Sequence, residues 1–175
     1  MADQDPITPT PEGSDEGQAD QPQAATIAQY IKDFSAESPS APQVFQWQAQ
    51  PTLDVQFGIN GNKVADDVHE VILKIDLAAK SDQGTHFIID LSYGGLFAFR
   101  NFPDEALPPF LLVEAPRLLF PFARQIIAET VQNLGFPPVL LDPIDFASAY
   151  VAQMEGQQQV PGQPGGNGEP PVGHA

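Results

Sequence analysis

The chain has 175 residues and carries 23 acidic side chains against 7 lysines and arginines, which gives a net charge of −16. This excess of negative charge argues against nucleic acid and anionic membrane as main partners, since both require positive charge to meet their phosphates. Partners with basic or unfolded basic segments are favoured instead. The chain contains no cysteine, so the sequence excludes a disulfide framework, a thiolate nucleophile and a cysteine-based zinc site.

The two ends of the sequence have the composition of disordered tails. Residues 1–25 are rich in proline, glycine and acids, and residues 154–175 are rich in glycine, proline and glutamine. We therefore expect one folded domain at residues 26–153. The acidic N-terminal end is unlike a signal peptide, and no apolar run approaches the roughly 20 residues of a membrane span. These features predict a soluble, cytoplasmic protein without direct membrane insertion.

Residues 26–34 alternate only weakly between apolar and polar side chains. They lead into a stretch that contains Pro39 and Pro42, which disfavour regular structure there. A solvent-exposed connector is the favoured interpretation, with Asp33 and Glu37 exposed.

Residues 44–57 predict a strand that is interrupted at Pro51, which suggests an edge strand or two short strands. After the proline, alternate apolar residues share one face: Leu53, Val55 and Phe57. Residues 58–63 contain Asn60-Gly61, a pair that predicts a turn because both residues tolerate positive φ.

Residues 64–80 form the longest strand candidate. Five apolar residues alternate on one face: Val71, Leu73, Ile75, Leu77 and Ala79. A helix is the alternative for this segment, but the strict alternation favours a strand. A turn at residues 81–84 then predicts a hairpin with the strand that follows.

Residues 85–102 continue the strand pattern. One face is apolar and aromatic, with Phe87, Ile89, Leu91 and Tyr93. The other face carries His86, Ile88, Asp90 and Ser92. Gly94-Gly95 interrupts the run and predicts a two-residue hairpin turn, with a bulge inside one longer strand as the alternative.

After residue 102 the pattern changes to a helical period. A short irregular segment at 104–114 contains two adjacent prolines, and a helix follows at 118–134. Its apolar face contains Leu119, Phe122, Ile126, Thr130 and Leu134 and is widened by Ala123, Ile127 and Val131. Gly135 predicts the end of that helix. Asp142 predicts the cap of a second helix that ends near residue 153. Strands followed by helices predict an α+β fold with a four-stranded antiparallel sheet and two C-terminal helices.

The sequence lacks the common signatures of catalysis. Asp67 and His69 share one face of a predicted strand, but no further ligands complete a metal site. No nucleotide-binding, zinc-protease or serine-hydrolase motif occurs. We therefore expect no enzyme, no metal and no cofactor. The apolar and aromatic surface exceeds what two helices can cover, which favours oligomerisation or ligand binding.

Five segments, taken together and in order, resemble the SecB family of protein-export chaperones. They are APQVFQ (Ala41–Gln46), ADDVHEVILK (Ala65–Lys74), GGLF (Gly94–Phe97), LFPFAR (Leu119–Arg124) and FPPVLLDPIDF (Phe136–Phe146). The resemblance covers residues 27–153 and leaves out both tails. It implies a homotetramer built as a dimer of dimers. It also implies a chaperone that binds unfolded precursor proteins, keeps them competent for translocation and delivers them to the SecA motor of the Sec translocase.

The resemblance also implies roles for particular residues. The SecA-binding positions of the family fall on Asp33, Glu37, Ile88 and Asp90. The positions that hold the tetramer together match Ile89, Leu91 and Tyr93. The client-groove positions match Leu53, Val55, Phe57 and Tyr150.

One position departs from the family pattern. The groove tryptophan of the family aligns near Ala49, whereas the one tryptophan of this chain is Trp47. We expect Trp47 to serve the same groove, because residues two apart share a strand face. The alternative function is a SecB-like chaperone dedicated to a single partner, such as an antitoxin. The acids Asp33, Glu37 and Asp90 favour the export function.

Overall fold

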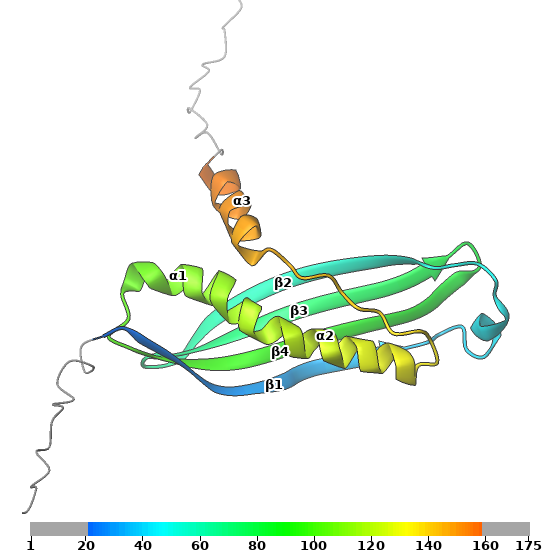
Figure 1. The fold of residues 1–175 in the computed structure, drawn as a ribbon, viewed down its shortest axis with the longest axis horizontal. Helices are drawn as coiled ribbons and strands as arrows, with labels where there is room; N and C mark the ends of the chain where they lie inside the picture. The colour runs from blue at the N-terminus through cyan, green and yellow to red at the C-terminus, as the bar shows by residue number, and fades with distance from the viewer. Residues whose placement is uncertain (1–20, 159–175) are drawn as a thin grey trace, which may run out of the picture.

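The computed structural model describes residues 21–158, which form one antiparallel sheet with helices on one of its faces (Figure 1). The sheet has four strands in the order β1-β4-β3-β2. Their bounds are Gln23–Glu37 for β1, Thr52–Ala65 for β2, Val68–Ser81 for β3 and Gly84–Arg100 for β4. The helices follow the strands in sequence, so the predicted α+β class and four-stranded antiparallel sheet are confirmed.

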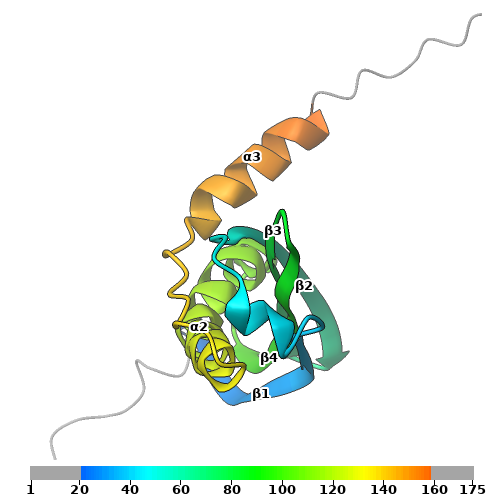
Figure 2. The same ribbon diagram turned by 90° about the vertical axis from the view of Figure 1, so that its right-hand side faces the viewer.

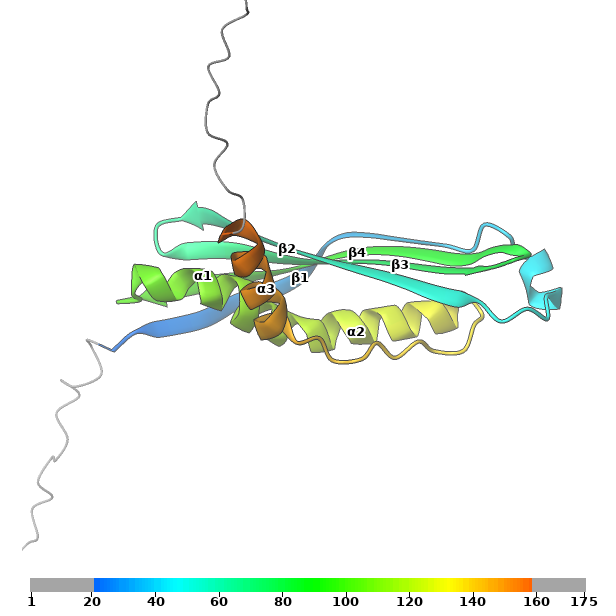
Figure 3. The same ribbon diagram turned by 90° about the horizontal axis from the view of Figure 1, so that it is seen from above.

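The two central strands follow the predicted alternation. The buried side chains of one face are Val71, Leu73, Ile75, Leu77, Ala79, Phe87, Ile89, Leu91 and Tyr93. The helix α2, Ala115–Asn133, lies along this face (Figure 3), which we call the helix face. The opposite side of the sheet, which includes Asp76 and Asp90, carries no helix within residues 21–158, and we call it the outer face.

Gly94 and Gly95 do not form the predicted hairpin turn, because both lie in the middle of the continuous strand β4. A Cβ atom on Gly95 would lie 2.8 Å from Leu119 of α2, and one on Gly94 would lie 2.9 Å from the ring of Tyr30. Both positions therefore require glycine, because neighbouring side chains lie too close to the strand backbone on both faces of the sheet to leave room for a Cβ atom. The alternative of one longer strand is correct, although the bulges lie in β1, which pairs with it.

The connector predicted at residues 26–34 is wrong, since these residues belong to β1, which pairs with β4 along its whole length. Register shifts after Thr26 and after Ile31 each add one residue to β1. Such bulges interrupt the alternation that identifies a strand in a sequence. β1 also begins at Gln23, so the predicted tail boundary at residue 25 falls inside the strand.

The residues before Pro51 do not form the predicted strand: Gln43–Gln46 form a 3-10 turn, η2, and residues 47–50 are irregular. β2 begins just after this proline and runs through the turn predicted at residues 58–63. The hairpin to β3 turns instead at Asp66-Asp67, where Asp67 has a φ of 57°. Pairing with the long, regular β3 outweighs the local turn preference of Asn60-Gly61.

The irregular segment predicted at residues 104–114 is helical. It consists of η3 (Asp104–Ala106), α1 (Leu107–Pro109) and a π-helical turn, η4 (Phe110–Glu114), and it continues directly into α2. The two prolines fit because they lie at the start of α1, where a missing N–H breaks no helical hydrogen bond. The helix at 104–133 is long and apolar enough to cross a membrane by length and composition, but here it packs on the sheet.

The buried stripe of α2 is one part of the predicted apolar face, the part that contains Leu119, Ala123, Ile127 and Val131. Its buried residues repeat mainly every four positions: Ala115, Leu119, Ala123, Ile127 and Val131, with Pro116 and Phe120 beside them. Phe122, predicted for the core, is 49% exposed. The apolar surface of α2 is wider than its contact with the sheet, so the sequence could not identify the contacting side.

The end of α2 agrees with prediction. Gly135 has a φ of +91°, and the N–H of Phe136 donates to the carbonyl of Val131, which together terminate the helix. The next helix, α3, spans Phe146–Gln158 and is capped by Asp145 rather than by the predicted Asp142.

α3 projects from the body of the molecule (Figure 2) and extends beyond the predicted boundary at residue 153. The predictions made for residues 1–20 and 159–175 lie outside the described part of the chain.

Candidate binding surfaces

The four residues expected to dock a partner lie together on the outer face. In the register of β1 with β4, Glu37 is opposite Ile88 and Asp33 is opposite Ser92. Directly paired residues point to the same side of a sheet, and Asp90 lies between Ile88 and Ser92 on that side. The structure therefore brings Asp33, Glu37, Ile88 and Asp90 onto two adjacent strands, away from the helices. Their role in docking remains a prediction.

The outer face carries two further acids that the sequence did not connect with this group. Asp76 of β3 is opposite Asp90 in the ladder, and Asp54 of β2 is opposite Ala78 one row away. A shallow hollow of about 120 Å³ lies between these side chains and Ile88. The sequence placed Asp76 on the polar side of its strand, but only the strand register shows that it adjoins Asp90.

Asp76 and Asp90 interact, and one lysine sets their order of protonation. Lys74 Nζ lies 3.0 Å from Asp76 Oδ1 and lowers the pKa of that carboxyl. The hydrogen bond to Asp76, together with burial, raises the pKa of Asp90. Asp90 is therefore the member of the pair that takes up a proton first as the pH falls. A cation placed near the pair would favour the form in which both are ionised.

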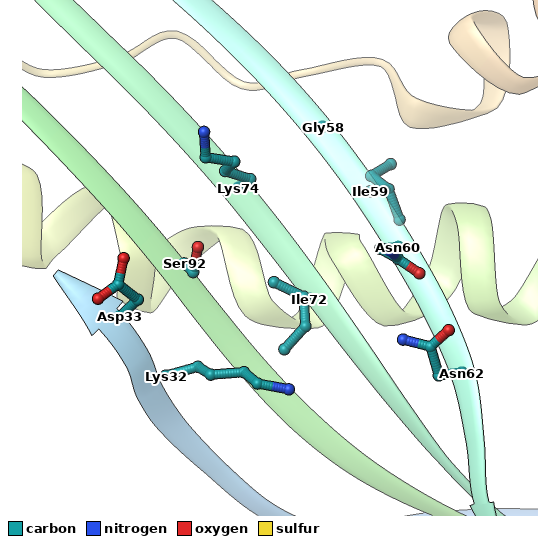
Figure 4. A pocket seen from close by; sticks show the side chains of 9 residues that line it. All are labelled: Lys32, Asp33, Gly58, Ile59, Asn60, Asn62, Ile72, Lys74 and Ser92. Atoms are coloured by element: carbon teal, nitrogen blue, oxygen red, sulfur yellow. The ribbon is translucent and has the colours of Figure 1, made fainter.

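A larger hollow of about 420 Å³ crosses the outer face further along the strands (Figure 4). Its rim includes Lys32 and Asp33 from β1 and Lys74 from β3, and the small Gly58 and Ser92 also line it. The rim carries both signs of charge, in contrast to the neighbouring group of acids.

A three-residue contact on the outer face ties the edge strand β1 to β3 across β4. The hydroxyl of Tyr30 donates to the carboxylate of Glu70, and Lys32 Nζ lies 2.7 Å from Glu70 Oε2. Burial, followed by the bond to Glu70, raises the pKa of Tyr30 to about 12, and the bond from Lys32 lowers the pKa of Glu70. Gly94 makes this contact possible because it leaves room for the ring of Tyr30. This contact could not be predicted from the sequence, because the three residues meet only through the strand register.

The residues expected to bind clients lie on the helix face of β2. Leu53 and Phe57 are each 42% exposed, and Val55 between them is half-buried. Phe57 and Tyr150 line one hollow of about 220 Å³. The other residues that line it are Ile59, Leu112, Ile144, Phe146 and Ala149. Segments of the chain that are almost a hundred residues apart therefore form one apolar surface. We call this surface, which consists of the hollow and the adjoining side chains Leu53, Val55 and Phe57 of β2, the groove.

Tyr150 also lines a second apolar hollow, of about 420 Å³, between α3 and the segment around α1 and η4. Phe102, Phe110 and Val113 contribute to it from one side, and Val151 from α3. This second hollow was not predicted, because the sequence read as irregular from residue 104 to residue 114. Phe110 in that segment and Phe102 just before it were the available signal.

Trp47 lies apart from Phe57 and Tyr150. Its ring stands edge-on to His86, with ring centroids 5.1 Å apart, and a Cβ on Gly84 would lie 3.0 Å from it. His86 is buried, against its predicted place on the polar face, and lies 2.9 Å from the Ser81 hydroxyl through Nε2. Trp47 therefore packs at the turn between β3 and β4, and it follows η2 rather than lying on the predicted strand.

Ile89, Leu91 and Tyr93 are buried within the protomer beneath α2. The ring of Tyr93 stacks against that of Phe122, with centroids 6.4 Å apart. Large apolar side chains are exposed beside this region: Ile31 and Phe34 on β1, and Leu118 and Phe122 on α2. If Ile89, Leu91 and Tyr93 influence the formation of an oligomer, they therefore do so indirectly, by holding α2 in place.

Comparison with known proteins identifies the family. The family described as "Preprotein translocase subunit SecB" matches residues 17–157. The chain belongs to the SecB family. The protein-export protein SecB of Sphingopyxis alaskensis is 50% identical over 159 residues, which cover 91% of this chain and 90% of that protein. The SecB of Zymomonas mobilis is 52% identical over 139 residues, which cover 79% of this chain and 85% of that protein.

A solved structure shares the SecB fold. It is the Mycobacterium tuberculosis SecB-like chaperone in complex with a ChAD peptide from the HigA1 antitoxin. The TM-score is 0.58 with 17% sequence identity, and the match covers 69% of this chain and 90% of that chain. At this identity the likeness supports the fold alone.

Within residues 21–158, no three histidine, aspartate or glutamate side chains come together as a metal site would require. His69 stands edge-on to Phe99 with centroids 5.4 Å apart, and its Nδ1 atom is buried without a hydrogen-bond partner. The residue thus packs as part of the β2–β3 end of the sheet.

Proposed function

We propose that this SecB family member is a cytoplasmic chaperone, and not an enzyme, that holds unfolded precursor proteins and delivers them to the SecA motor. The family membership carries the proposal, because the relatives with about half of their residues identical are named protein-export proteins. The groove supports it, since exposed apolar side chains on an edge strand suit many client sequences.

The two candidate surfaces face opposite ways. The groove lies on the helix face, and the acids Asp33, Glu37 and Asp90 lie on the outer face. A client in the groove therefore leaves the outer face free for a basic element of SecA. Charge attraction between such surfaces speeds encounter and weakens with salt.

The assembly we propose is a homotetramer formed as a dimer of dimers. Its support is the apolar surface around α2 and β1, where Ile31, Phe34, Leu118 and Phe122 remain exposed in the single protomer. A second copy that covers this surface would bury side chains that otherwise face water. Ile89, Leu91 and Tyr93 would then support the interface from beneath α2.

The dedicated single-partner chaperone remains the second candidate. The Mycobacterium tuberculosis SecB-like chaperone in complex with an antitoxin peptide shares the fold, at 17% identity. The export function is favoured by the much higher identity to proteins named for export and by the acids on the outer face.

A charge reversal on the outer face tests SecA docking. Asp90→Lys should abolish SecA binding in titration calorimetry and leave the affinity for an unfolded precursor unchanged. The matched control is Asp82→Lys, which makes the same charge change at an exposed position in the β3–β4 turn, off the outer face. If Asp90→Lys bound SecA with unchanged affinity and salt response, the docking assignment would be wrong.

A further inference from the structure

The two carboxylates at the centre of the outer face lie directly opposite each other. The strand register forms one row across the sheet from Ser35, Asp90, Asp76 and Gln56. Directly paired residues point to the same side of an antiparallel sheet, with Cβ atoms about 5 Å apart. Like charges in this arrangement repel each other and disfavour the form in which both are ionised. The pair Asp76 and Asp90 therefore binds a proton more readily than two separate aspartates would.

The rows on either side add mostly negative charge. One of them carries Glu37 on β1 and Asp54 on β2. The other carries Asp33 on β1 and Lys74 on β3, which flank Ser92 of β4 (Figure 4). The three rows lie wholly within the described residues, and Lys74 is their one cation. The repulsion within the central pair is therefore opposed by a single side chain.

That lysine serves one member of the pair. Lys74 Nζ lies 3.0 Å from Asp76 Oδ1 and 3.1 Å from its Oδ2. Among the ion pairs found in residues 21–158, none includes Asp90, whose neighbour on β1 is the uncharged Ser35. Asp76 is thus held in its ionised form, and a proton that enters the row binds at Asp90. The raised pKa of Asp90 and the lowered pKa of Asp76 agree with this geometry.

We propose that Asp76 makes docking on the outer face sensitive to pH, because it holds a proton on Asp90 that a docking basic element must displace. The inference rests on the proposed function and deepens it by naming how the docking surface is regulated. Asp76 is not one of the docking positions that the family resemblance implies, and it acts through Asp90. The displaced proton passes to the solvent, so the step needs no other reactant.

The direction of the pH effect follows from the charges. A docked cation favours the ionised form of Asp90, so docking lowers the pKa of this carboxyl from its raised value in the free protein. Docking therefore releases a proton and weakens as the pH falls through the pKa of free Asp90. Below that pH, the Kd for SecA should rise by about tenfold per pH unit, as expected for one displaced proton.

An NMR titration of the aspartate carboxyl carbons tests the pair in the full chain without a partner. Asp90 should titrate above the ordinary aspartate pKa of about 3.9. Asp76→Asn keeps the size of the side chain and removes its charge, so it should lower the pKa of Asp90. Asp54→Asn is the matched control, because it removes one charge from the same face at a residue opposite Ala78, and it should leave the pKa of Asp90 nearly unchanged. If Asp90 titrated at or below the ordinary value in the parent chain, the inference would be wrong.

Calorimetry with SecA tests the coupling to docking. The parent, Asp76→Asn and Asp54→Asn are titrated with the same SecA from about pH 8 to about pH 5, so the partner's own protonation is common to all three. The loss of affinity should begin at a lower pH in Asp76→Asn than in the other two chains. Parallel pH profiles in all three would overturn the inference and leave SecA docking standing. A parent chain that failed to bind SecA at every pH would overturn the proposed docking together with this inference.

Discussion

Substitution of Phe57 tests most directly whether the groove binds clients. Its side chain is 42% exposed, and its ring stands edge-on to Phe120 with centroids 6.4 Å apart. A phenylalanine side chain can bury roughly 200 Å², so the exposed part leaves about 80 Å² for a client. At about 25 cal/mol per Å² that area contributes about 2 kcal/mol to binding. Phe57→Ala should therefore raise the Kd for an unfolded client by roughly thirtyfold.

The assay is an anisotropy titration with a labelled precursor held unfolded, and urea unfolding of each variant confirms that it folds. Val64→Ala is the matched control, because Val64 is 53% exposed on the same strand but does not line the groove. Its affinity for the client should stay within about twofold of the parent, as for most surface substitutions. If Phe57→Ala folded and bound the client as tightly as this control, the groove would not be the client site.

Three further predictions concern the fold. Gly95→Ala should lower the free energy of unfolding by about 1–3 kcal/mol through overpacking against Leu119 and the ring of Phe97, and Leu119→Ala in the same chain should reduce the cost of the glycine substitution by removing one of these two contacts. Additive effects of these two substitutions in urea unfolding would contradict the close approach of α2 to β4. Glu70→Gln should cost about 1 kcal/mol at neutral pH, because it weakens the contact between the largely buried Glu70 carboxylate and the half-exposed Lys32. Since folding lowers the pKa of Glu70, that stabilisation is present above about pH 4.3 and is lost as the pH falls through the folded-state pKa. Urea unfolding of the Glu70→Gln variant should therefore show a shallower loss of stability in acid, and an identical pH profile would refute the assignment. Asp145→Ala should destabilise α3 by about 1 kcal/mol through loss of its cap, seen as faster hydrogen exchange at Ser148, whereas unchanged exchange would show that the cap does not stabilise α3.

The sequence predicted the central strands correctly for a physical reason. β3 and β4 are covered by α2 on one face only, so their side chains alternate between core and surface. The edge strands were harder to predict from the sequence. β1 is interrupted by two bulges and keeps most of its side chains exposed, so its pattern is weak. Gly94-Gly95 has the local chemistry of a turn, and the close approach of side chains such as Leu119 and Tyr30 explains glycine inside a strand.

The candidate surfaces could likewise be predicted only in part from the sequence. Alternation alone places Ile88 and Asp90 on the face opposite Ile89, and the structure agrees. The neighbours of Asp90 could not be predicted, because a pairing such as that with Asp76 depends on strand register. The hollow at Tyr150 depends on where α3 packs, and the helix cap was assigned three residues too early.

We propose that client and SecA use opposite faces of this chain. Light scattering of the full chain, mixed with an unfolded precursor and SecA, tests it directly. We expect a ternary complex in which SecA binds the client-loaded chaperone as tightly as the free one. If precursor and SecA displaced each other, both would bind one shared surface, and the assignment of the two faces to different partners would be wrong.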